Sequence, residues 1–154
     1  ARYSFNNANI RRDEIGTYST NTGYELGLVA TQLLHKVALS TSVSYQKALQ
    51  NDPLFYLGNA SAVNYTFSIG KLMLPKEYIN YKQPNMNVMV EFLGQTNSRN
   101  GSSYLDVAPS LQLIINSQSR IDVGYRQQLY SSMKRAVGNG IIVRFEYNFF
   151  NIFN

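Results

Sequence analysis

Cysteine and tryptophan are absent from the 154 residues, and histidine occurs once, at position 35. Without cysteine the chain can form neither a disulfide framework nor a thiolate metal site. It contains no H-E-x-x-H run, no Asp-rich calcium loop and no second histidine, so we expect no metal and no cofactor. Long hydrophobic runs are missing too. No stretch approaches the ~20 apolar residues of a membrane helix, which excludes a helical membrane protein.

Charged residues are also scarce, at 15% of the chain, against about 25% in typical soluble domains. In their place stand 12 Tyr, 8 Phe and many uncharged polar residues. The net charge is +5, but basic residues adjoin one another only at Arg11-Arg12 and Lys134-Arg135. This scatter is not a nucleic-acid-binding patch, and we expect no nucleic-acid partner. Low charge with many aromatics is typical of a protein whose outside contacts a lipid bilayer.

Apolar and polar residues alternate with a period of two, most clearly over residues 142–150. One side of that segment is apolar: Val143, Phe145, Tyr147 and Phe149. Similar alternation marks six earlier segments: residues 24–34, 37–47, 63–73, 86–95, 105–115 and 121–130. Residues 2–8 form a shorter, Asn-rich candidate. Because successive side chains of a strand point to opposite faces, the pattern predicts strands with one apolar and one polar face. Pro109 interrupts one of them and indicates a bulge or an incorrect assignment there.

The connections alternate in length, as in outer-membrane barrels with short periplasmic turns and long external loops. Long connections are residues 9–23, 50–62, 96–104 and 131–140, and the opposite end has residues 35–36, 74–85 and 116–120. We therefore predict a single domain, residues 1–154, folded as an antiparallel up-and-down transmembrane β-barrel of about eight strands, complete in itself or part of a larger barrel. Such a protein belongs in the bacterial outer membrane, with the lipid bilayer as its surroundings.

The aromatic last strand resembles the C-terminal signal that barrel-assembly machinery recognises. Its candidate residues are Phe145, Tyr147, Phe149 and Phe150. The alternative is an ordinary closing strand of a soluble barrel. Aromatics near the ends of segments would suit the girdles at the membrane interfaces, although tyrosine is also simply a good strand former. These are Tyr24, Tyr45, Tyr104, Tyr130, Tyr147 and Phe149.

Seven charged side chains are predicted on the polar face, turned toward the lumen: Glu25, Glu91, Asp106, Asp122, Arg126, Arg144 and Glu146. Charges facing a narrow lumen must pair or be hydrated. They form either a polar pathway for small solutes or a salt-bridged plug, and the choice depends on the width of the barrel. His35 lies in a two-residue turn without a nearby acidic partner in sequence, so we expect no catalytic residue and no enzymatic activity.

Several motifs together resemble a known family. They are Gly70-Lys-Leu-Met-Leu-Pro-Lys-Glu-Tyr, Tyr81-Lys-Gln, Glu91-Phe-Leu-Gly-Gln95, Tyr104-Leu-Asp-Val-Ala-Pro-Ser-Leu-Gln112 and Arg120-Ile-Asp-Val-Gly-Tyr-Arg126. Residues 63–154 resemble the C-terminal half of the transporter-like outer-membrane barrels labelled "MetA-pathway of phenol degradation" in Bacteroidetes-type Gram-negative bacteria. The resemblance implies transport. Members are generally longer, so the resemblance leaves open both an eight-stranded barrel and a larger one with further N-terminal strands, and no signal peptide is visible at the start of the sequence.

Three functions remain open at this point. The first is a porin-like channel or transporter for small molecules, and the second is a structural or docking barrel that binds other envelope proteins through its long loops. The third is a soluble calycin-like barrel holding a hydrophobic ligand, in which the apolar face would point inward. The Gly, Ser, Ala, Asn and Gln of the other face favour lipid on the apolar side, because a solvated outer face would carry more Lys and Glu.

Overall fold

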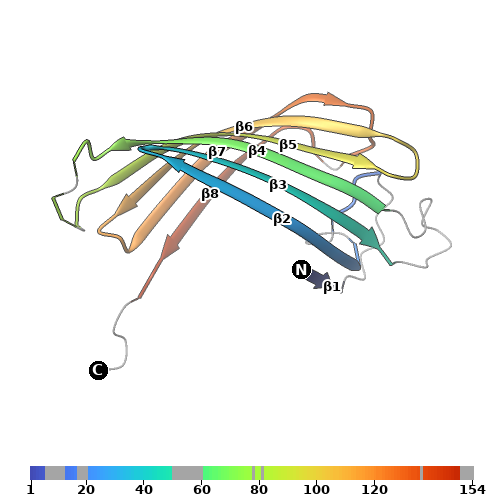
Figure 1. Ribbon diagram of the computed structural model, residues 1–154, viewed down its shortest axis with the longest axis horizontal. Coiled ribbons are helices and arrows are strands. Elements are labelled where there is room, and N and C mark those ends of the chain that lie inside the picture. The colour runs from blue at the N-terminus through green and yellow to red at the C-terminus, as the bar shows by residue number, and fades with distance from the viewer. Residues whose placement is uncertain are drawn as a thin grey trace.

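The computed structural model describes residues 1–5, 13–16, 21–49, 61–77, 79–80, 82–135 and 137–149. All regular structure in these ranges is β, in one antiparallel sheet whose strand order follows the sequence (Figure 1). The strands are β1 Arg2–Ser4, β2 Gly23–Leu34, β3 Val37–Ala48, β4 Ser61–Leu74, β5 Asn85–Asn97, β6 Ser103–Ile115, β7 Ser119–Ser131 and β8 Gly140–Tyr147. The prediction of an all-β up-and-down fold is confirmed.

Two of the tight turns expected from the sequence join their strands as hairpins. His35 and Lys36 connect β2 to β3, and His35 takes a left-handed φ of 54°. Asn116 and Ser117 take φ values of 53° and 55° in the three-residue turn between β6 and β7. Left-handed backbone of this kind lets the chain reverse within two or three residues, so the register of each hairpin is fixed by its turn.

Pro109 lies inside β6 without the bulge that the sequence suggested. It faces Val90 of β5 in an unshifted register. Pairing with β7 is interrupted only at residues 108 and 109. The register is the same before and after this gap, because Val107 faces Gln127 and Ser110 faces Gly124. The irregularity of this pair lies nearer the start of β6, after Leu105. Pro109 removes one backbone hydrogen bond from the sheet but does not shift the register of its strands.

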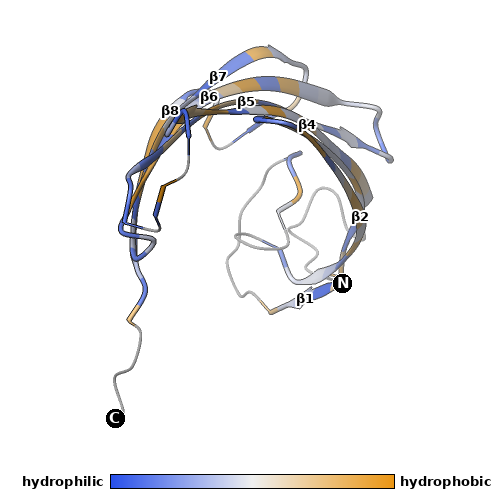
Figure 2. Ribbon diagram, turned by 60° about the vertical axis from the view of Figure 1, so that its left-hand side comes forward, coloured by the Kyte–Doolittle hydropathy of each residue, from blue (hydrophilic) through white to orange (hydrophobic). Residues whose placement is uncertain are grey.

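The sheet curls into an arch, seen nearly end-on in Figure 2. β1 pairs only with residues 23–25 of β2, and β8 pairs only with β7. Within the described residues β1 and β8 do not meet, so the expected closure of eight strands on themselves is not observed there. The arch is barrel-like in its curvature and open along its first and last strands.

The two faces of the arch differ in chemistry. The convex outer face carries exposed apolar side chains from every long strand: Leu28, Val43, Phe67, Phe92, Leu111, Val123 and Phe145. The largest fully buried side chains lie on the concave inner face and are polar: Gln46, Gln95, Asn97 and Asp106. A small apolar cluster of Ile15, Ala48 and Ala62 lies beside them. Among the described residues, half of the buried side chains are therefore polar, and a large apolar surface points outward.

Candidate functional site

The inner face brings the seven predicted charged residues to one side of the sheet. Residues directly opposite each other on neighbouring strands share a face. Glu25 lies opposite Gln46, Glu91 opposite Ser68, and Asp106 opposite Gln128. Further along, β8 meets β7 on this face through four pairs, three of which contain charged residues: Arg144 with Asp122, Glu146 with Arg120, and Gly140 with Arg126.

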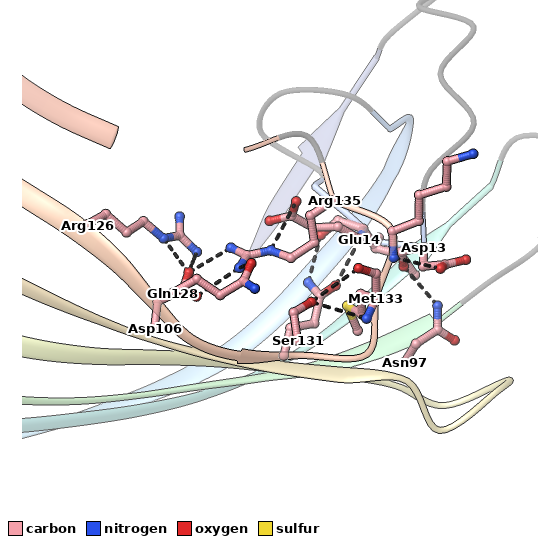
Figure 3. A network of polar contacts seen from close by, with 12 residues as sticks. Asp13, Glu14, Asn97, Asp106, Arg126, Gln128, Ser131, Met133 and Arg135 are labelled. Atoms are coloured by element: carbon pink, nitrogen blue, oxygen red, sulfur yellow. Dashed lines mark hydrogen bonds and ion pairs between the residues drawn. The ribbon is translucent and has the colours of Figure 1, made fainter. Parts of the chain in front are cut away.

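Asp106 is the centre of one charge cluster, near the end of the sheet that carries the longer connections (Figure 3). Its fully buried carboxylate accepts two hydrogen bonds from Arg135, from Nη1 to Oδ1 at 2.8 Å and from Nη2 to Oδ2 at 2.7 Å. Arg126 approaches from β7 and donates from Nε to Oδ2 at 2.5 Å. Glu14 lies 3.8 Å from Arg135 Nε. We call these four residues the loop-end cluster.

Tyr104 supports the loop-end cluster from the inner face. The guanidinium carbon of Arg135 lies 3.7 Å from the centre of its ring, and that of Arg126 lies 5.6 Å away. A cation over an aromatic face is attracted by the ring quadrupole. The prediction that Tyr104 belongs to a membrane girdle is wrong, because the tyrosine lies opposite Gln95 and is 7% exposed on the inner face.

A segment from the N-terminal part of the chain lies across the same end of the inner face. Gln95 accepts a hydrogen bond from the Ile15 amide at 2.9 Å and donates one to the Ile15 carbonyl at 2.8 Å. Asn97 donates to the Asp13 carbonyl, and the Asp13 carboxylate accepts from the Lys134 amide. Buried side-chain amides thus replace a neighbouring strand as partners for the backbone of residues 13–15. The segment and residues 133–135 together cover this end of the arch.

A second charge cluster lies near the other end of the inner face, by the short turns. The Asp122 carboxylate accepts from Arg144 Nε at 2.7 Å and from Arg120 Nε at 3.1 Å. Gln112 also donates to Asp122, at 2.9 Å, and accepts in turn from Asn87 at 3.0 Å. The chain of contacts crosses β5, β6, β7 and β8 in one row. We call Arg120, Asp122 and Arg144 the turn-end cluster; Arg144 is 54% exposed and Asp122 16%.

The predicted residues therefore fall into separate groups. Two pairs among the seven predicted residues are in contact, Asp106 with Arg126 and Asp122 with Arg144. Glu25 lies apart, where it accepts from Ser44 at 2.6 Å and pairs with Arg2. No ion pair joins Glu91 or Glu146 to another described residue.

Three of the cluster residues were missed by the sequence interpretation, namely Glu14, Arg120 and Arg135, as was the contact of Tyr104 with the loop-end cluster. Arg120 was assigned to a turn, but β7 begins at Ser119. Arg120 is two residues from Asp122, and this spacing alone would have placed the two side chains on the same face of the strand. Glu14 and Arg135 come from connections, where strand periodicity gives no signal about which way a side chain points.

Between the clusters the concave face encloses a hollow of about 790 Å³. Its walls come from β2 through β8 and include both charged and apolar side chains. Pockets that bind small molecules have volumes of about 300–1,000 Å³, so the hollow is large enough for a solute.

The proposed assembly residues lie on and beyond β8. Phe145 and Tyr147 are exposed on the outer face, and Phe149, which follows the strand, contacts Tyr147 edge-to-face at 4.7 Å between ring centres. Phe150 lies outside the described residues. His35 is exposed in its turn at the rim of the hollow.

Comparison with known proteins gave no match to a family model, to a curated protein or to a solved structure. The resemblance inferred from the motifs stays a prediction. Among the described residues there is no helix long and apolar enough to cross a membrane. Nor do those residues contain a group of three or more His, Cys, Asp or Glu side chains placed to hold a metal ion.

Proposed function

We propose that this chain forms a barrel wall in the bacterial outer membrane and acts as a channel or transporter for small molecules. The observation that carries the proposal is the inverted distribution of side chains. Leu28, Phe67 and Phe145 are 83%, 42% and 67% exposed on the convex face, whereas Gln95 and Asp106 are buried on the concave face. In water this arrangement would leave a large apolar surface uncovered. Against lipid it is favourable.

Strand length supports the same proposal. β2 through β7 contain 12 to 14 residues each, which at ~3.3 Å per residue gives about 40–46 Å. A membrane-spanning strand needs about 9–11 residues, so each of them is long enough to cross while tilted. Two of the three connections at one end have two and three residues, as is usual for the periplasmic turns of these barrels, although the third, residues 75–84 between β4 and β5, is longer.

The transport role is supported by the inner face. The turn-end cluster places partly exposed charged side chains beside the hollow, while the loop-end cluster and residues 13–16 narrow the other end. A polar, partly obstructed interior is typical of barrels that pass or bind solutes. The calycin-like alternative needs a predominantly apolar concave face. The largest fully buried side chains of this face, Gln46, Gln95, Asn97 and Asp106, are polar, which disfavours a calycin-like barrel.

The absence of cysteine allows a direct test, because single cysteines can be introduced without background labelling. We would place them one at a time at Phe67, Ser68, Ile69 and Gly70 of β4 in protein reconstituted into liposomes. A charged, water-soluble thiol reagent is expected to modify positions 68 and 70 on the inner face and to spare positions 67 and 69. Equal labelling of all four positions, or failure of the protein to associate with liposomes, would refute membrane insertion.

The transport role needs its own measurement. Liposomes containing the protein are expected to swell in an isosmotic solution of a small sugar, whereas protein-free liposomes are not. Alternating cysteine protection without swelling would leave the membrane barrel in place but reject the channel, and would favour the structural or docking role.

A further inference from the structure

The hollow in the concave face has two chemically different walls. Its wall on β2 through β5 contains the apolar side chains of Leu33, Ala38, Leu72, Met89 and Leu93, together with the polar Asn87 and the acidic Glu91. The wall on β7 and β8 carries the guanidinium groups of Arg120, Arg126 and Arg144. The register joins the two walls in one row, which runs from Leu72 through Asn87, Gln112 and Asp122 to Arg144. At ~4.8 Å between neighbouring strands, Leu72 and Arg144 are about 19 Å apart along the sheet.

Positive charge exceeds negative charge in this hollow. Four basic side chains line it, namely Lys36, Arg120, Arg126 and Arg144, against the two carboxylates of Glu91 and Asp122. Asp122 is shared between two arginines, so one carboxylate meets two guanidinium groups. Arg126 also shares its carboxylate, Asp106, with Arg135. Each guanidinium has five N–H donors, and Arg144, at 54% exposure, has donors available to a solute.

We propose that the hollow binds amphipathic organic anions, molecules with a carboxylate or sulfonate head and an apolar body. The head contacts Arg144 and Arg120 beside Asp122, and the body extends toward Met89 and Leu72. Planar guanidinium groups bind such oxyanions through paired, charge-assisted hydrogen bonds. The inference rests on the proposed function, since it names the class of solute that the inner face would pass, but binding is measurable without transport.

Three probes with an unbranched ten-carbon chain separate the contributions of charge and apolar contact: decanoate, decanol and decyltrimethylammonium. Equilibrium dialysis of the protein in a neutral detergent, corrected with protein-free detergent, gives the dissociation constant of each. We expect decanoate to bind at least tenfold more tightly than the other two, and its advantage to shrink as salt is added. Equal binding of the three probes, or tighter binding of the cation, would overturn the inference without any variant being needed.

Variants locate the head and the body. Arg144→Gln is expected to weaken decanoate binding about tenfold and to leave decanol unchanged, because one charge-assisted contact is lost. Met89→Gln is expected to weaken decanoate and decanol alike. Lys82→Gln is the matched control, since it removes one positive charge at an exposed position of the connection between β4 and β5, outside the hollow. If Lys82→Gln weakens decanoate as much as Arg144→Gln does, binding follows net charge and the site is wrong.

The inference and the proposed function can fail separately. Selective binding of decanoate without liposome swelling would reject the channel and retain the binding site. Swelling in small sugars with no preference among the three probes would retain the channel and reject the binding site.

Discussion

Asp106 offers the sharpest test of how the inner face is held together. Replacing it with asparagine changes one oxygen for an amide nitrogen and removes one negative charge, with almost no change in volume. The carboxylate is fully buried, and the side chain of its principal partner, Arg135, is 3% exposed. Arg126, its second partner, is 26% exposed. The substitution leaves Arg135 buried with Glu14, at 3.8 Å, as its remaining acidic neighbour.

The expected cost follows from this burial. Removing one member of a buried ion pair costs about 3–5 kcal/mol, because the remaining charge stays desolvated. Arg126 recovers part of its hydration through its exposed fraction, and Glu14 partly offsets the charge of Arg135. We therefore expect Asp106→Asn to lower the free energy of unfolding by about 3 kcal/mol, toward the lower end of that range.

The matched control is the same substitution at Asp122. It also accepts from two arginines on the inner face, but those arginines are 34% and 54% exposed, and water can replace the lost contacts. Exposed pairs contribute about 0–1 kcal/mol, so Asp122→Asn is expected to cost no more than about 1 kcal/mol. Urea unfolding of both variants in the same detergent measures the difference. If Asp106→Asn costs no more than Asp122→Asn, the loop-end cluster does not stabilise the fold as argued.

Two further substitutions test other contacts. Gly94→Ala places a methyl group against the ring of Tyr65 on the neighbouring strand, so we expect the free energy of unfolding, measured by the same urea assay, to fall by about 1–3 kcal/mol. Gly70→Ala is the control and is expected to be tolerated, because the nearest atom to its new methyl group is 3.9 Å away. Gln95→Ala removes the side-chain partners of the Ile15 backbone, so we expect the free energy of unfolding to fall by about 2–3 kcal/mol. The Ile15 amide should also exchange its hydrogen faster, and slow exchange in the variant would count against the contact.

Much of the fold was accessible from the sequence because strands carry a local signal. Side chains alternate between faces with a period of two, so the seven long strands were located without knowledge of their partners, although most of their ends lie one to three residues away from the expected positions. The period survives Pro109 because the proline disturbs hydrogen bonding toward one neighbour only. The closure of the sheet into a barrel has no comparable local signal in the sequence. Whether β8 meets another strand depends on the summed curvature of the whole arch, which no single segment encodes.

The candidate site was less accessible for the same reason. Asp106 and Arg126 were placed on the inner face by alternation, since both belong to strands. Arg135 follows the end of β7, and Glu14 lies in the connection between β1 and β2, so nothing periodic predicts where they point. Their contacts join residues 106, 135 and 14, which are far apart in the chain. Interpretation by strand periodicity finds the charges of a sheet and misses the loop charges that cover them.

One arrangement occurs at both ends of the inner face: an aspartate that accepts from two arginines. The surroundings decide what each can do. At the loop end, residues 13–16 and 133–135 cover Asp106 and exclude water, so its pairs are strong and inaccessible, which suits the anchoring of a connection to the sheet. At the turn end no described segment covers Asp122, and Arg144 keeps donors toward the hollow. The same residue types therefore serve stability where they are covered and solute binding where they are open.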